Sequence, residues 1–265
     1  MFLNSVVLIL QEILEAALLI SVLLAFTRLR DVGHRWIVAA IIIGCLGAFL
    51  YALNMAQISE WFDYVGQEVT NAFIQLSIML LLSIFAARHL GRPDHQPSQG
   101  HNREFILCML FIVSLALTRE VSEIFIYIGG AITDPSNVQP TLIGAGIGAG
   151  IGISAGVLIY YSLLGLPSKW IALTGLLLLS LVAGNMASQA TLLLTQADWL
   201  PYSRILWDSS ELLPENSVLG HLLYALIGYE ATPSLYQGLG YVIGMLLILI
   251  GTKFTVWLNN AAPKS

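Results

Sequence analysis

LNSVVLILQEILEAALLISVLLAF, residues 3–26, is an almost unbroken apolar run in which the only ionisable side chains are Glu12 and Glu15. A helix needs about 20 mainly apolar residues to cross the hydrocarbon core of a bilayer. The run therefore predicts a membrane-spanning helix that carries two carboxylates into the lipid.

Six further segments repeat this composition, which predicts an all-α, polytopic membrane helix bundle forming a single domain, residues 1–265. The seven predicted spans are residues 3–26, 36–58, 69–87, 105–128, 141–164, 171–195 and 238–257. Charged residues make up 10% of the chain and the mean hydropathy is +0.80, whereas soluble domains contain about 25% charged residues. We expect a lipid bilayer around this chain and no nucleic acid partner. The apolar segment 218–227 is too short to span and predicts an interfacial or re-entrant helix.

Basic residues divide unevenly between the two sets of loops that seven spans create. One set and the C-terminal end hold Arg28, Arg30, Arg35, Arg88, Arg92, Arg103, Lys169, Lys253 and Lys264, and the other set holds Arg204 alone. Because Lys and Arg concentrate in short cytoplasmic loops, the C-terminus is predicted to be cytoplasmic and the N-terminus to be outside.

Two Glu-x-x-Glu motifs lie inside predicted spans, Gln11-Glu12-Ile13-Leu14-Glu15 in the first and Arg119-Glu120-Val121-Ser122-Glu123 in the fourth. Glutamates three residues apart share one face of a helix, with Cβ atoms about 5–6 Å apart. At 1.5 Å per residue, the first motif lies ~13 Å and the second ~12 Å from the outer end of its span. The four carboxylates are therefore predicted to converge if the two helices touch.

Four carboxylates inside a membrane need a compensating interaction. Each costs about 2.5–3.5 kcal/mol at a helix centre, so four cost on the order of 10 kcal/mol, as much as the stability of a domain. With Arg119, the ionised site has a net charge of −3, which protonation, water or a multivalent cation can offset. Oxygen ligands suit hard cations. We predict a cation site formed by Glu12, Glu15, Glu120 and Glu123, with Gln11 and Arg119 auxiliary to it.

Other polar and small residues inside the spans indicate how an ion path and helix contacts are built. Candidate path-lining residues are Asn54, Asn71, Gln75, Asn185 and Gln189, although each alone is better explained by an interhelical hydrogen bond. Gly144, Gly148, Gly152 and Gly156 recur every four residues and predict a helix face that packs closely on a neighbour.

The two motifs resemble the Arg-Glu-x-x-Glu signatures of the high-affinity iron permease family of fungi and bacteria. That family has seven spans, an outside N-terminus and its motifs in spans one and four, so the resemblance covers nearly the whole chain. Trp207-Asp208-Ser209-Ser210-Glu211 is similar to the family's Asp-x-Ser-Glu element in its last external loop. Gln11 departs from the pattern, because the family usually has Arg at that position.

The resemblance implies that iron is the transported substrate, with the four glutamates as ligands, Asp208 and Glu211 as external iron-capture residues, and no further cofactor. It also implies an external or periplasmic partner that oxidises or delivers iron. One motif in each half of three spans predicts a 3+3 inverted repeat followed by a seventh helix.

We therefore predict an iron permease of the cell membrane, most consistent with a bacterial inner membrane. A permease for another divalent cation, Mn²⁺ or Pb²⁺, remains an alternative, because four carboxylates do not exclude it. An intramembrane metal-dependent enzyme is disfavoured, because the chain has neither the Glu-x-x-His pairs of di-iron bundles nor His-Glu-x-x-His.

Overall fold

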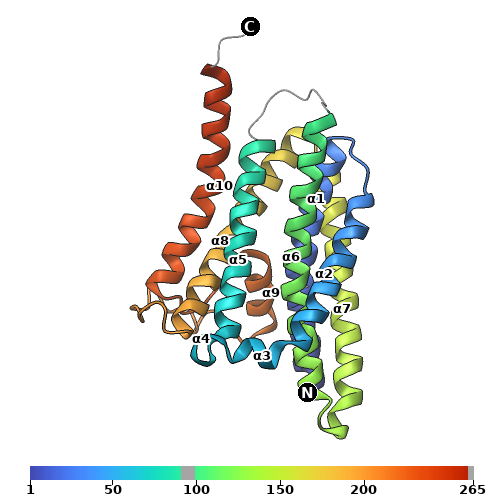
Figure 1. Cartoon of the computed structure of the whole chain (residues 1–265), viewed down its shortest axis with the longest axis vertical. Helices are drawn as coiled ribbons and strands as arrows, with labels where there is room; N and C mark the ends of the chain where they lie inside the picture. The colour runs from blue at the N-terminus through green and yellow to red at the C-terminus, as the bar shows by residue number, and fades with distance from the viewer. Residues whose placement is uncertain (91–98, 262–265) are drawn as a thin grey trace.

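The computed structural model describes residues 1–90 and 99–261, and in them the chain is a bundle of long helices (Figure 1). The helices are α1 (Phe2–Leu29), α2 (Arg35–Leu53), α3 (Met55–Ser59), α4 (Trp61–Tyr64), α5 (Gly66–Phe85), the π-helix η1 (Ala86–Leu90), α6 (Gln99–Ala131), α7 (Pro135–Leu164), α8 (Ser168–Gln196), α9 (Val218–Ile227) and α10 (Leu235–Ala261). The predicted all-helical class is confirmed.

Seven of the helices in the described residues are long and apolar enough to cross a membrane, as the sequence predicts. They are α1, α2, α5 with η1, α6, α7, α8 and α10. The second predicted span, 36–58, extends past the end of α2, which stops at Leu53. There the Asn54 side chain donates a hydrogen bond to the Leu50 carbonyl (2.7 Å), and such a local bond competes with continuation of the helix.

Side-chain caps explain where α7 and α9 begin. Asp134 accepts a hydrogen bond from the Ser136 amide (2.9 Å) ahead of Pro135, the first residue of α7. Ser217 accepts one from the Gly220 amide (3.0 Å) and starts α9. These contacts satisfy backbone donors that have no partner inside the helix.

Glycines bring helices from different parts of the chain into close contact. On α7, a Cβ added at Gly148 would lie 2.5 Å from the Val6 carbonyl of α1. On α2, a Cβ at Gly44 would lie 2.6 Å from Leu117 Cβ of α6. The two most extensive helix pairs are accordingly α1 with α7 and α2 with α6.

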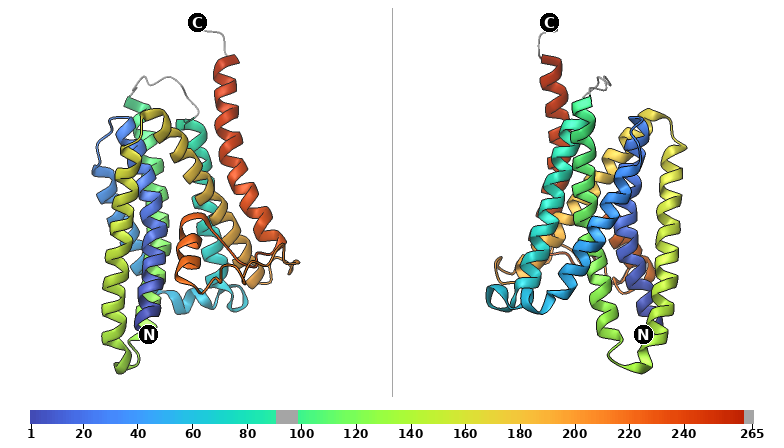
Figure 2. Two further views of the ribbon diagram at one scale, coloured as in Figure 1. Left: turned by 180° about the vertical axis from the view of Figure 1, so that it is seen from behind. Right: turned by 45° about the vertical axis from the view of Figure 1, so that its right-hand side comes forward.

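The ends and edges of the bundle are well separated. The N-terminus lies at one end and the C-terminal end of α10 at the other, while α7 and α10 stand at opposite edges (Figures 1 and 2). Toward the C-terminal end, the space between α1, α5 and α6 is filled by fully buried apolar side chains, including Leu23, Leu82, Phe85, Phe105 and Met109.

Of the basic residues used to predict orientation, Arg92 and Lys264 lie outside the described residues.

Candidate carboxylate site and its comparisons

The two Glu-x-x-Glu motifs meet where α1 packs against α6. Glu12, Glu15 and Glu120 are almost completely buried, with exposed fractions of 5%, 6% and 1%. Glu123 is partly exposed, with 30% of its side-chain surface accessible. The predicted convergence of the motifs is thus seen in the structure, with one carboxylate at the edge of the cluster.

Arg119 is the cationic partner of this cluster. Its Nη1 lies 2.8 Å from Glu120 Oε1 and 3.3 Å from Glu15 Oε2. Its Nε lies 3.1 Å from Glu123 Oε1. One guanidinium therefore compensates only part of the charge of four carboxylates.

Three oxygens of these buried carboxyl groups have no hydrogen-bond partner among the described residues. They are Glu12 Oε2, Glu15 Oε1 and Glu120 Oε2. Leaving a buried polar atom unpaired costs about 1–3 kcal/mol, and more for a charged group. Within the described residues, no group of three or more His, Cys, Asp or Glu side chains is arranged so that it could hold a metal ion. Coordination of an ion by several of these carboxylates would therefore require side chains, Arg119 among them, to move.

Two cavities on the side of the N-terminus adjoin the cluster. One, of about 440 Å³, is lined by Arg119 and Glu123 together with Asn71 and Gln189. The second, of about 490 Å³, is lined by Gln11, Glu215, His221 and Glu230. Leu192 and Tyr224 line both. The two cavities are therefore neighbours and lie between the loop that joins α9 to α10 and the carboxylates.

The second cavity, which we call the outer vestibule because none of the four glutamates lines it, contains groups that the sequence did not single out. Gln11 Oε1 and His221 Nδ1 lie within hydrogen-bond distance (2.9 Å), which ties α1 to α9. Glu215 accepts a hydrogen bond from the Ala231 amide (2.7 Å), and Gln237 donates one to Glu230. Burial, with a smaller contribution from the charge of Glu215, raises the pKa of the Glu230 carboxyl to about 7.

Four of the five candidate path-lining residues come together between α5 and α8. Asn71, Gln75, Asn185 and Gln189 are each 5% exposed or less, and the Nε2 of Gln75 donates to Gln189 Oε1 (2.6 Å). The fifth, Asn54, is exposed and caps α2, away from both cavities.

Asp208 and Glu211 are exposed and line neither cavity. Asp208 accepts hydrogen bonds from the Ser210 hydroxyl (2.5 Å) and amide (3.0 Å). The side-chain bond, followed by the backbone bond, lowers the pKa of the Asp208 carboxyl. These two residues stay a prediction as capture residues, while Glu215 and Glu230 are the loop carboxylates that line the outer vestibule.

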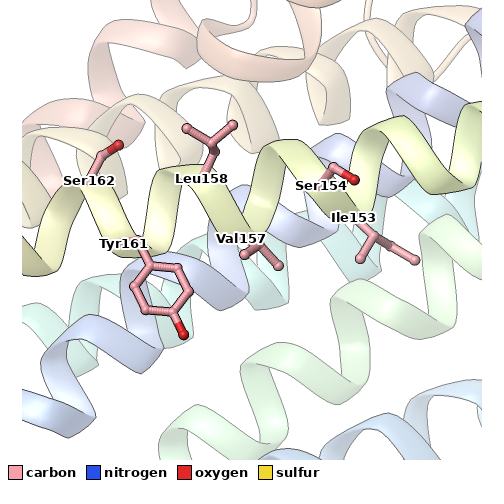
Figure 3. Close-up of a pocket in the computed structure, with 6 residues that line it drawn as sticks. All are labelled: Ile153, Ser154, Val157, Leu158, Tyr161 and Ser162. Atoms are coloured by element: carbon pink, nitrogen blue, oxygen red, sulfur yellow. The ribbon is translucent and has the colours of Figure 1, made fainter.

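A third hollow, of about 560 Å³, lies along a single face of α7 and has a different character (Figure 3). Its lining is mostly apolar and well exposed, with Val157, Leu158 and Tyr161 at 50%, 67% and 66%. Such a surface suits contact with lipid tails, and we assign it no part in the site.

Comparisons with known proteins agree with the geometry. The model of the "Iron permease FTR1 family" matches residues 2–259. The chain is 26% identical to the "Ferrous iron permease EfeU" of Escherichia coli O6:H1, over 91% of this chain and 92% of that protein. It is 26% identical to the protein of the same name from Yersinia pestis, over 91% and 89%.

A third relative, from Escherichia coli strain K12, is named "Putative inactive ferrous iron permease EfeU" and is 25% identical over 91% of each chain. No solved structure matches this chain. The family match extends over both motifs and all seven long apolar helices. The chain is a multi-pass membrane protein of the FTR1 iron permease family, a transporter rather than an enzyme.

Proposed function

We propose that this permease moves iron across the cytoplasmic membrane through a site whose transient ligands are Glu12, Glu15, Glu120 and Glu123. The observation that carries the proposal is the set of three buried carboxylate oxygens without a hydrogen-bond partner among the described residues, where α1 meets α6. A hard cation supplies the interaction that these oxygens lack. The bacterial relatives, named as ferrous iron permeases, support Fe²⁺ as the ion and the cytoplasmic membrane as its location.

Arg119 gives the site a means of binding an ion without holding it permanently. An arriving Fe²⁺ competes with the guanidinium for Glu15, Glu120 and Glu123, and the guanidinium returns to them when the ion leaves. The exchange keeps a cation beside Glu15, Glu120 and Glu123 at each stage, which matters because one unpaired buried charge costs several kcal/mol. Binding is then favourable enough for entry and weak enough for release.

The ion would enter from the outer vestibule, where Glu215 and Glu230 attract cations. The proposed orientation places this vestibule and the N-terminus outside, in keeping with the single Arg204 in the loops of that side. The membrane potential then favours inward movement by about 2.3 kcal/mol per charge per 100 mV. An external protein that oxidises or delivers iron would act at the same face.

A 3+3 inverted repeat would relate α1, α2 and α5 with η1 to α6, α7 and α8, leaving α10 as the seventh span. Two contacts support it. The first helix of each half packs on the second helix of the other, α1 on α7 and α6 on α2, and glycines line both contacts. Such repeats place the substrate site at their interface near the middle of the membrane, where the motifs lie.

The test is uptake of radioactive Fe²⁺ by iron-starved cells that lack their own iron transporters. Glu12→Gln and Glu120→Gln remove one charge each and retain size, and both are expected to reduce uptake at least about tenfold, since each removes a ligand of the transported ion. Ser77→Ala serves as the control, because the exposed Ser77 hydroxyl bonds to the Phe73 carbonyl of its own helix (2.7 Å). All variants are compared at equal amounts in the membrane.

Uptake that persists in both glutamine variants would remove the carboxylates from the mechanism. Competition between metal ions for uptake identifies the transported ion. An excess of Mn²⁺ or Pb²⁺ that fails to reduce Fe²⁺ uptake supports iron, whereas either ion taken up in preference to iron would change the assigned substrate.

A further inference from the structure

The helices α5 and α8 carry the same short pattern, Asn71-x-x-x-Gln75 and Asn185-x-x-x-Gln189. Residues four apart share one face of a helix, so each helix presents two amides together. The helices pack against each other along their length. The third span of one half thus matches the third span of the other in its polar residues, as the first spans match in their carboxylates.

Three of the four amides are joined by hydrogen bonds, and together with Asn71 we call them the amide cluster. Gln75 donates to Gln189 (2.6 Å), and the Nε2 of Gln189 donates to Asn185 Oδ1 (3.2 Å). The hydroxyl of Tyr51 donates to Asn71 Oδ1 (3.1 Å). One acceptor is left over, because Gln75 Oε1 has no hydrogen-bond partner among the described residues, although Gln75 is 0% exposed.

The amide cluster adjoins the carboxylates. Asn71 and Gln189 line the same cavity of about 440 Å³ as Arg119 and Glu123. Two members of the amide cluster thus lie on the same cavity as two members of the carboxylate cluster, while Gln75 and Asn185 lie behind them, each bonded to Gln189. On the far side, toward the C-terminal end, Ile78 and Leu82 on α5 are fully buried.

We propose that Asn71, Gln75, Asn185 and Gln189 form a second cation position, a neutral one built of amide oxygens, to which the four glutamates pass the metal ion. This rests on the proposed function and extends it. Amide carbonyl oxygens are hard ligands for divalent cations. Because these oxygens are uncharged, they bind an ion more weakly than carboxylates do. A second position beside the glutamates gives the ion a place to move to, and weak binding there allows its release.

The competing explanation is that the four amides only join α5 to α8. In that case, apolar side chains of similar size can take the place of the amides without loss of transport. Replacing both members of a buried hydrogen-bonded pair by apolar groups of similar shape costs little stability. An ion position needs the oxygens themselves.

The experiment uses the full-length protein, both reconstituted in liposomes and in detergent, with Fe²⁺ kept reduced as the probe. The double variant Gln75→Met/Gln189→Met is compared with wild type, with Glu12→Gln/Glu120→Gln, and with Ser77→Ala as control. Uptake, equilibrium Fe²⁺ binding and the midpoint of thermal unfolding are measured for each. We expect the methionine variant to lose uptake at least about tenfold while it keeps Fe²⁺ binding, because the carboxylates are intact. Its unfolding midpoint should fall only by the loss of the bond from Gln189 to Asn185.

Wild-type uptake in the methionine variant, with uptake lost in the glutamate variant, would show that the amides only join the helices, and the proposed function would stand. Retained uptake in the glutamate variant would overturn the proposed function itself. If the methionine variant does not fold, the variant Gln75→Glu tests the second cation position instead. A charged ligand at the second position is expected to bind Fe²⁺ about tenfold more tightly and release it more slowly, whereas unchanged affinity and turnover would refute the second position.

Discussion

Arg119 sets the behaviour of the carboxylate site. It contacts Glu15, Glu120 and Glu123 at 2.8–3.3 Å and is 7% exposed. A buried ion pair adds little stability compared with apolar packing, but its loss leaves an uncompensated charge. In the proposed mechanism this residue is an exchangeable counter-ion rather than a structural element.

Glu230, which lines the outer vestibule, makes a pH-dependent contribution to the stability of the folded protein. Its pKa is raised to about 7, chiefly by burial. A carboxyl whose pKa is higher in the folded protein favours folding below its unfolded pKa of 4.5, and this contribution is lost as pH rises through about 7. We expect Glu230→Gln to reduce the fall in thermal unfolding midpoint between pH 5 and pH 8, by the equivalent of about 1–3 kcal/mol.

Glu211→Gln is the matched control, because Glu211 is an exposed acid of the same outer segment. Its unfolding midpoint should follow the wild-type pH profile. Identical pH profiles for wild type and Glu230→Gln would show that Glu230 does not titrate in this range.

At this scale the sequence predicts residues that lie on regular helices and misses those on loops. The spacing of Glu12 with Glu15 and of Glu120 with Glu123 is enough by itself to place each pair on one helix face. Glu215 and Glu230 are brought together by the irregular segment around α9, which has no periodicity from which their proximity could be inferred.

At the scale of the helices, the contact of α7 with α1 positions the first motif. Gly144, Gly148, Gly152 and Gly156 are buried on α7. An added Cβ at each of them would lie within 2.5–2.8 Å of an atom of α1. The predicted small-residue face is confirmed. No pattern in the sequence specifies that this face of α7 packs against α1.

Gly148→Ala is therefore expected to push α1 away from α7, because the new methyl group meets backbone atoms at Val6 and Leu10 that cannot rotate aside. Overpacking of this kind costs about 1–3 kcal/mol, and displacement of the helix that carries Glu12 should also lower Fe²⁺ uptake. Thermal unfolding in detergent and uptake in liposomes measure the two effects.

Gly146→Ala is the control, since a Cβ at Gly146 has nothing within 4 Å among the described residues. It should leave stability and uptake at wild-type levels. Equal behaviour of the two alanine variants would mean that the contact tolerates a methyl group and does not determine the position of α1.

At the scale of the whole molecule, the sequence predicts the number of long apolar helices but not how they pair. Length and composition suffice for the number, because each span needs the same stretch of apolar residues. Pairing depends on side-chain fit between segments more than 100 residues apart, such as Glu15 and Arg119, and this fit leaves no periodic pattern in either segment.

The orientation of the bundle can be tested with single cysteines in a variant whose native Cys45 and Cys108 are replaced by alanine. Thr133→Cys lies between α6 and α7, on the side of the N-terminus, and Gly33→Cys lies between α1 and α2 on the other side. Because basic loops stay in the cytoplasm, a membrane-impermeant maleimide should label Thr133→Cys in intact cells. It should label Gly33→Cys only after the membrane is opened, and the reverse pattern would invert the proposed route.

The crossed pairing of helices also has a consequence for how the chain is made. Glu15 finds its partner Arg119 only 104 residues later in the chain, which at about 5–20 residues per second takes the ribosome roughly 5–20 s. The close partner of α1, α7, emerges later still. During synthesis the first helix must therefore be held by the insertion machinery or by neighbouring lipids, and the permease can assemble only when its second half is almost complete.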